Sequence, residues 1–147
     1  MSERTKSSID IAAPPEAVLQ VITDFEAYPE WAGEVKEARV QERDDAGRAT
    51  RAWYRMDAGA LRDEHTLAYE YPSDVEVRWT LVSSNMMRAL DGSYVVQAAE
   101  GGGSHVTYQL AVDVKLPMVG LLKRKVEKLI IDRALSGLKK RVEAISA

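Results

Sequence analysis

The chain contains no cysteine and only two histidines among its 147 residues. Without cysteine, a disulfide framework, an iron–sulfur cluster and a thiol nucleophile are excluded. His65 and His105 fall in different predicted strands and offer no ligand spacing for a metal site, so we expect no metal and no tightly held cofactor. No apolar run approaches the roughly 20 residues of a membrane span, so no transmembrane segment is expected. Residues 1–10 are too polar for a secretory signal, and we expect a cytoplasmic protein.

The composition is that of a globular domain with a substantial core. Hydrophobic residues make up 46% of the chain and charged residues 29%, a balance that disordered and fibrous proteins do not show. A chain of this length is enough for one ordinary domain and too short for two. We therefore expect a single domain over residues 1–147.

Charge is distributed unevenly along the chain. Residues 115–147 carry nine Lys and Arg against three acidic residues, whereas the preceding 114 residues carry 11 basic and 20 acidic ones. The simpler interpretation is the solvated face of a long helix. The alternative is a weak contact with an anionic surface through Lys123, Arg124, Lys125 and Lys128. No aromatic residue lies between these basic residues, which argues against single-stranded nucleic acid, and no DNA partner is expected.

The first 31 residues predict a short strand followed by two short helices. Residues 5–11 alternate between apolar and polar side chains, which is typical of a strand. Pro14 and Pro15 suit the first turn of a helix because their missing N–H groups would have no partner there. Apolar residues then recur every three or four positions up to about Asp24. After this point residues 28–31 predict a second helical turn.

From residue 35 to residue 114 the hydrophobic pattern changes to a period of two, which predicts strands joined by tight turns. Turn signals rich in Gly, Asp, Asn, Ser and Pro separate them, and such regular spacing indicates one antiparallel sheet. The predicted strands span residues 35–43, 48–57, 60–71, 75–83, 88–99 and 104–114. In the fourth of these strands the apolar set is Val75, Val77, Trp79 and Leu81.

The apolar face of this sheet needs a cover, and the long helix predicted over residues 116–145 is the only segment large enough. Its apolar residues form two stripes on nearly opposite sides. One contains Leu122, Val126, Leu129 and Ile130; the other begins at Ile131 and continues to Ile145 in four- and three-residue steps. One straight helix cannot bury both stripes against one sheet. The pattern predicts either a kink near residues 130–131 or a first half that faces something other than the sheet.

This order of elements resembles the helix-grip fold of the START-like (SRPBCC) superfamily. The resemblance is closest to the branch of bacterial polyketide cyclase/dehydrase and coenzyme Q-binding-like proteins, actinobacterial type. It rests on stretches at residues 9–16, 23–31, 92–94, 106–108 and 138–143. It implies an α+β class, with a curved antiparallel seven-stranded sheet, two short N-terminal helices and a long C-terminal helix.

The resemblance also implies an elongated apolar cavity between the sheet and the long helix that holds a lipid, quinone or polyketide-like molecule. The strand faces indicate which side chains would line it, with ordinary core packing as the alternative role for each. Tyrosine and tryptophan favour a pocket slightly, because their polar atoms need partners. The candidates are Trp31, Tyr54, Met56, His65, Leu67, Tyr69, Trp79, Tyr94, Tyr108, Met118, Leu122 and Val126.

Few residues point to a catalytic site. Asp63 and His65 fall on the same predicted strand face, where a carboxylate orients an imidazole for acid–base work; the simpler interpretation is a hydrogen-bonded histidine in a cavity wall. The better-known cyclases that the chain resembles place Trp, Ser and Arg at alternate inward positions of the strand after Gly47-Arg48. Here those positions hold Ala52, Tyr54 and Met56, so the inward arginine is missing. A register shift of one residue would restore it.

We therefore expect a protein that binds, sequesters or transports a small hydrophobic molecule rather than an enzyme. If the chain is an enzyme, it is a polyketide aromatase/cyclase or dehydrase, for which Tyr54, Asp63 and His65 are the weak catalytic candidates. A second alternative, implied by relatives of the ribosome-association type, is a regulatory protein that contacts RNA through the basic C-terminal helix.

Overall fold

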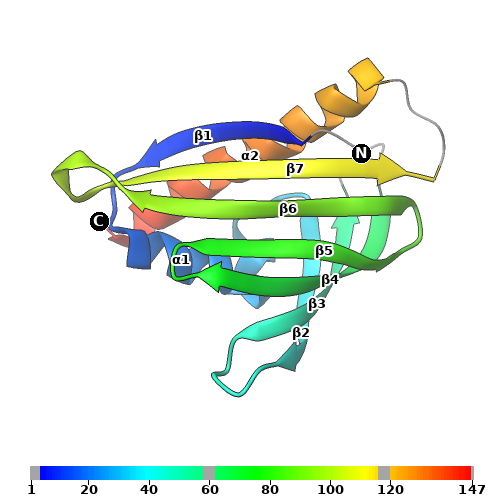
Figure 1. Cartoon of the computed structure of the whole chain (residues 1–147), viewed down its shortest axis with the longest axis horizontal. Coiled ribbons are helices and arrows are strands. Elements are labelled where there is room, and N and C mark those ends of the chain that lie inside the picture. Colours follow the sequence, from blue (N-terminus) through cyan, green and yellow to red (C-terminus); the bar gives the residue numbers. More distant parts are fainter. Residues whose placement is uncertain (1–3, 58–61, 116–119, 147) are drawn as a thin grey trace.

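Seven antiparallel strands form one sheet, and helices pack against it (Figure 1). This computed structural model describes residues 4–57, 62–115 and 120–146. The strand order is β1-β7-β6-β5-β4-β3-β2. The strands are β1 (Thr5–Ile11), β2 (Val35–Arg43), β3 (Ala49–Asp57), β4 (Arg62–Ser73), β5 (Glu76–Ser84), β6 (Met87–Ala98) and β7 (Ser104–Val114). The helices are α1 (Pro15–Thr23), the 3-10 helices η1 (Phe25–Glu30) and η2 (Glu100–Gly102), and α2 (Gly120–Ser146).

The predicted α+β class and antiparallel sheet are confirmed, with two local differences. The second short helix is a 3-10 helix, η1, rather than an α-helix. It contains Pro29, which cannot donate a backbone hydrogen bond and so shortens regular helix. Val75, predicted to face inward, precedes β5 and is 39% exposed, whereas Val77 and Trp79 on the same strand are buried.

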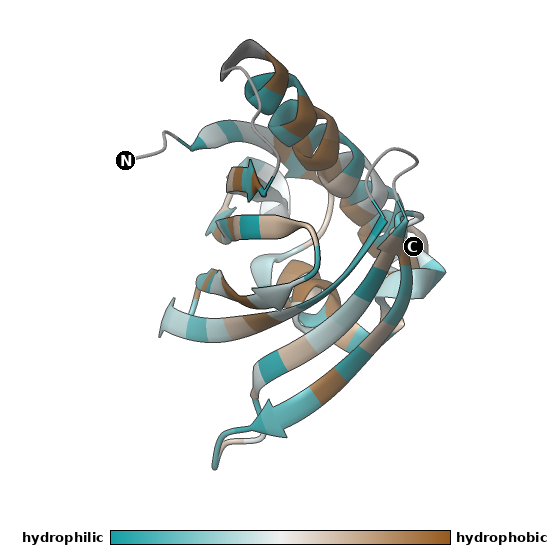
Figure 2. Cartoon of the chain, turned by 90° about the vertical axis from the view of Figure 1, so that its right-hand side faces the viewer, coloured by the Kyte–Doolittle hydropathy of each residue, from teal (hydrophilic) through white to brown (hydrophobic). Residues whose placement is uncertain are grey.

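The sheet is strongly curved, and its two ends face each other across the interior. Figure 2 shows the strands as a bent layer, with α2 lying along one side. Register shifts interrupt the β2–β3 pairing near Val40 and the β4–β5 pairing at Thr66 and Leu67. Bulges of this kind bend a sheet and increase its twist. The curvature brings the concave faces of the central strands toward α2.

One continuous stripe of α2 packs on β1 and β7, where Figure 1 places the helix behind the sheet. The members of this stripe are all buried: Glu127, Ile131, Leu135, Leu138 and Val142. Their spacing of four, four, three and four residues keeps them on one helical face. The helix is uninterrupted from Gly120 to Ser146, and Glu127 holds its first half against β1 and β7. The structure therefore shows neither a break at residues 130–131 nor a first half turned away from the sheet, and both predicted alternatives are wrong.

Glu127 explains why hydropathy alone suggested a change of face. The sheet-facing stripe continues into the first half of α2 through a carboxylate, which carries no hydrophobic signal. Glu127 accepts hydrogen bonds from Thr5 Oγ1 at 2.7 Å and from the Val112 amide at 2.7 Å, and Lys123 Nζ lies at 2.5 Å.

Within the described ranges, no helix is long and apolar enough to cross a membrane.

Candidate functional site

A cavity of about 140 Å³ lies between the concave face of the sheet and the helices. Strands β3 to β7 supply most of its wall, and η1, the η1–β2 connection and α2 close the remaining sides. Its lining is mainly aromatic and aliphatic. It is lined by Ile22, Phe25, Tyr28, Trp31, Ala32, Glu34, Val35, Tyr54, Met56, His65, Leu67, Tyr69, Val77, Trp79, Leu90, Tyr94, Tyr108, Leu129, Ile130, Arg133 and Ala134.

Nine of the twelve predicted lining residues reach this cavity, and the alternation along β3 to β7 accounts for all of them except Trp31, which lies in the η1–β2 connection. They are Trp31, Tyr54, Met56, His65, Leu67, Tyr69, Trp79, Tyr94 and Tyr108. Leu122 and Val126 do not line it, and Leu122 is 49% exposed. With Glu127 directed at the sheet, those two residues point elsewhere. Met118 lies outside the described residues.

Other lining residues escaped the sequence prediction for identifiable reasons. Leu90 has the same strand parity as Tyr94 and was predictable from it. Leu129, Ile130, Arg133 and Ala134 sit on the flank of α2 beside the sheet-facing stripe. That flank is found only when Glu127 is counted as buried. Arg133 carries no hydropathy signal at all.

Three aromatic rings form one part of the wall. Trp79 lies 5.5 Å from Tyr94 and 5.5 Å from Tyr108, and the two tyrosine rings are 4.6 Å apart in an edge-to-face arrangement (distances between ring centroids). Tyr94 and Tyr108 are directly paired across β6 and β7. Neither hydroxyl has a hydrogen-bond partner among the described residues, although buried tyrosine hydroxyls usually find one. Both are therefore available to a guest molecule.

The hydroxyls of the other tyrosines in the cavity wall already have hydrogen-bond partners. The hydroxyls of Tyr54 and Tyr69 are hydrogen-bonded to each other, and the Tyr28 hydroxyl donates to the carbonyl of Ile22 at 2.6 Å. Burial raises the pKa of Tyr28, Tyr69 and Tyr94 well above the ordinary tyrosine value. The cavity wall therefore carries neutral hydroxyls.

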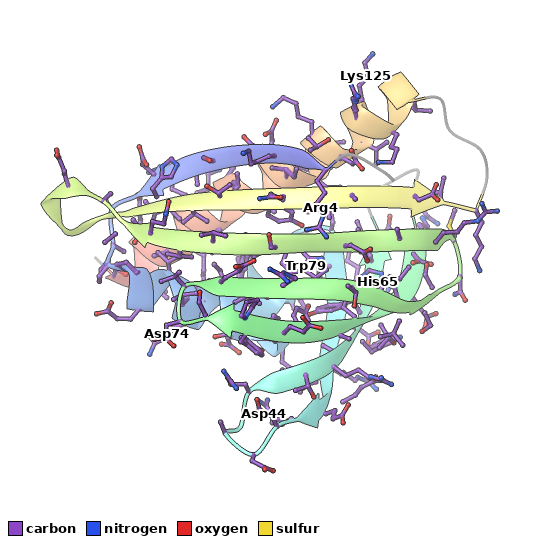
Figure 3. All side chains as sticks on the ribbon, viewed as in Figure 1. Arg4, Asp44, His65, Asp74, Trp79 and Lys125 are labelled. Atoms are coloured by element: carbon purple, nitrogen blue, oxygen red, sulfur yellow. The ribbon has the colours of Figure 1, made fainter. Side chains whose placement is uncertain are left out.

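His65, on β4, is a buried imidazole among the lining residues (Figure 3). Its side chain is 5% exposed, and its Nδ1 lies 3.5 Å from Asp63 Oδ2 without forming a hydrogen bond. Burial lowers the pKa of His65, with the Asp63 carboxylate opposing the shift, so the imidazole is neutral near pH 7. The Tyr54 ring is tilted beside it, 5.5 Å between centroids.

Asp63 stabilises a turn through hydrogen bonds, a role that the sequence pattern did not predict. Its Oδ1 accepts the amides of Asn85 and Met86, each at 3.1 Å, and its Oδ2 accepts the Ser84 hydroxyl at 2.5 Å. The carboxylate thus closes the turn between β5 and β6. This arrangement fixes the carboxylate beside His65 without an imidazole–carboxylate hydrogen bond.

The strand that would carry a cyclase arginine has the predicted register. Ala52, Tyr54 and Met56 are buried, whereas Arg51 and Arg55 are exposed. Arg55 Nε lies 2.9 Å from Glu37 Oε1 on the outer face of the sheet. Among the residues that the structure describes, Arg133 is the one arginine that lines the cavity, and its Nη1 lies 3.1 Å from Glu34 Oε1. This ion pair joins α2 to the η1–β2 connection.

The basic residues of α2 are partly neutralised by neighbouring carboxylates. Lys123 pairs with Glu127, and Lys128 Nζ lies 2.9 Å from Asp132 Oδ2. Lys125 projects away from the sheet in Figure 3. Among the residues that the structure describes, no group of three or more His, Asp or Glu side chains is arranged to hold a metal ion.

The fold is shared with several solved structures. A START superfamily protein from Mycobacterium smegmatis matches with a TM-score of 0.93 and 22% identity, over 98% of this chain and 99% of that one. An aromatase/cyclase from Streptomyces sp. R1128 matches with a TM-score of 0.76 and 9% identity, over 99% of this chain and 96% of that one. At these identities the likeness concerns the fold.

Sequence comparison adds a relative and a family. An uncharacterized protein of Mycobacterium tuberculosis (strain H37Rv) is 27% identical over 97 residues, which is 66% of this chain. The match spans only 58% of that relative's length. The model of the family described as "Polyketide cyclase / dehydrase and lipid transport" matches residues 2–143. Since this match spans nearly the whole sequence, the chain belongs to that family, in agreement with the START-like fold built above.

Proposed function

We propose that this chain binds a small hydrophobic molecule in the cavity between the sheet and α2. The observation that carries the proposal is an unfilled space lined by aromatic side chains, two of which present unpartnered hydroxyls. Well-packed interiors leave few voids larger than a water molecule. A concave apolar site with a few polar groups is the usual form of a ligand pocket.

The test fills the space without removing any existing contact. Ala134 lines the cavity from α2, whereas Ala144 on the same helix is exposed. Ala134→Phe is expected to abolish binding of a small uncharged probe such as 4-ethylphenol, measured by isothermal titration calorimetry, because the new ring occupies the space. Ala144→Phe is the matched control and keeps the affinity. Native mass spectrometry of gently purified protein then shows whether a bound molecule is present in the first variant.

Two outcomes separate cavity binding from surface adsorption. If both variants bind the probe as the unaltered chain does, the probe is adsorbed elsewhere and the proposed function loses its support. If only Ala134→Phe loses binding while its unfolding curve stays cooperative, the cavity is the site.

Polyketide cyclisation is a second candidate function. The similarity to the Streptomyces aromatase/cyclase and the presence of Tyr54 and neutral His65 in one wall favour it. A neutral imidazole can accept a proton from a carbon acid, and a tyrosine hydroxyl can stabilise an enolate. The outward direction of Arg51 and Arg55 argues against it. Formation of an aromatic product from a poly-β-ketone, lost in His65→Gln, would establish it.

A macromolecular partner has less support from the geometry. Contact with an anionic lipid surface through Lys123, Arg124, Lys125 and Lys128 remains a proposal, and the ion pairs of Lys123 and Lys128 with acidic neighbours reduce the charge available for it. The same pairing weakens the alternative of RNA binding. Either contact would weaken steeply with added salt, whereas occupation of the cavity would be nearly independent of salt.

A further inference from the structure

The size of the cavity limits what it can hold. At about 140 Å³ it is smaller than the usual ligand pocket of about 300 Å³ or more. An apolar cavity of about 150 Å³ accommodates one benzene ring. Without movement of α2, the space therefore suits a single six-membered ring with short substituents rather than a fused polycycle or a long acyl chain.

The charge of the cavity wall further limits which molecules the cavity can hold. Of the ionisable residues that line the cavity, Arg133 and Glu34 neutralise each other, and the tyrosines are uncharged. His65 is neutral for the reason given above. A carboxylate guest would therefore be desolvated without a counter-charge, which is costly in an apolar site. An uncharged guest avoids this cost.

His65 adds a directional requirement. With a carboxylate oxygen 3.5 Å from Nδ1, the tautomer that carries its proton on Nδ1 is favoured, because the other tautomer would set a lone pair against negative charge. Nε2 is then unprotonated and can accept a hydrogen bond. Of the two ring nitrogens, only Nδ1 is fully buried without a partner, and Nε2 lies on the side of the ring away from Asp63. An acceptor that reaches an apolar cavity favours a guest with a hydroxyl donor.

We propose that the cavity selects an uncharged, single-ring aromatic molecule with a phenolic hydroxyl, and that this hydroxyl donates a hydrogen bond to Nε2 of His65. The proposal rests on the ligand-binding function argued above and names the ligand class for that site. The ring packs beside Tyr54, whose ring centroid lies 5.5 Å from that of His65.

The test compares two probes of nearly equal size, 4-ethylphenol and 4-ethyltoluene, which differ by a hydroxyl in place of a methyl group. Isothermal titration calorimetry of the unaltered chain is expected to show a preference of about fivefold to tenfold for the phenol, the worth of one neutral hydrogen bond. His65→Leu should remove the preference while 4-ethyltoluene still binds. His65→Gln, which retains an acceptor, should restore part of it, and His105→Gln on the surface should change nothing.

Each outcome bears on a different claim. Equal affinity of the unaltered chain for both probes overturns the hydroxyl selectivity but leaves the proposed function standing. A preference that survives in His65→Leu overturns the assignment to His65. Binding of larger dyes without either single-ring probe overturns the size argument. If no hydrophobic probe binds at all, the proposed function itself fails. The comparison of probes on the unaltered chain holds even if a His65 variant does not fold.

Discussion

Glu127 in α2 accepts a hydrogen bond from the backbone amide of Val112 in β7, 2.7 Å away, and the glutamate is completely buried. Thr5 and Lys123 satisfy the same carboxylate. A buried carboxylate is tolerated only when it is paired and hydrogen-bonded. These contacts attach the first half of α2 to β1 and β7, and so fix the flank that carries Leu129 and Arg133 against the cavity.

Replacing this carboxylate is expected to destabilise the protein strongly. Glu127→Leu leaves the Val112 amide without an acceptor and Lys123 without its counter-charge, so the free energy of unfolding should fall by about 3 kcal/mol. Urea unfolding measures the difference. Glu143→Leu is the matched control: Glu143 also accepts a backbone amide and pairs with Lys139, but it is partly exposed. Equal losses in the two variants would show that burial of Glu127 is unimportant.

Gly92 is expected to be irreplaceable because of its contact with Trp79. A Cβ at this position would lie 2.5 Å from the carbonyl oxygen of Gln109 and 2.6 Å from Trp79 Cζ2. Gly92→Ala should therefore lower the free energy of unfolding by about 2 kcal/mol through overpacking. Because it also pushes the indole into the cavity, it should weaken binding of a single-ring probe. Gly33→Ala, where a Cβ meets nothing within 4 Å, is the control; a comparable loss there would contradict the steric explanation.

Much of the fold was predictable because the strands obey a simple period. In β3, β4 and β5 the alternation between faces identified Tyr54, His65, Tyr69 and Trp79 as inward side chains. The resemblance to the helix-grip fold supplied the order of the elements and the expectation of a cavity. The two residues that were wrongly predicted to line the cavity, Leu122 and Val126, lie on α2. The sheet-facing stripe of this helix includes the buried charge of Glu127, so the hydrophobic pattern alone identified the wrong face.

Other features depend on contacts between distant residues and have no local signal. The ion pair between Glu34 and Arg133 joins segments 99 residues apart. The three donors to Asp63 come from the last residue of β5 and the turn that follows it. Neither arrangement follows from periodicity, because each depends on the register and curvature of the assembled sheet.

Alkaline pH is expected to unfold the protein cooperatively. The pKa of every one of the six tyrosines is raised, with burial as the largest cause. The unfolded chain would lose these protons near about pH 10, before the folded chain does. Stability is therefore intact below that pH and declines as the pH rises through it. Ultraviolet absorbance of tyrosinate and circular dichroism should change together; stepwise ionisation of a folded protein would contradict the expectation.

Arg133 is expected to affect ligand exchange more than stability. Its ion pair with Glu34 lies at the edge of the cavity and is half-exposed, and such pairs contribute about 0–1 kcal/mol to folding. Arg133→Ala should leave urea unfolding nearly unchanged but accelerate both entry and release of a probe in stopped-flow fluorescence. Arg141→Ala removes a comparable pair with Glu30 away from the cavity. Identical exchange rates in the two variants would show that the Glu34–Arg133 pair does not limit access.

The central claim is that a small hydrophobic molecule occupies the space between the curved sheet and α2. The most direct measurement is the set of intermolecular nuclear Overhauser effects between bound 4-ethylphenol and the side chains of the protein. The account predicts contacts with Tyr54, His65 and Leu67 inside the cavity. Contacts confined to the outer-face Trp53 or to exposed Leu122, with none to the inner aromatic rings, would contradict it.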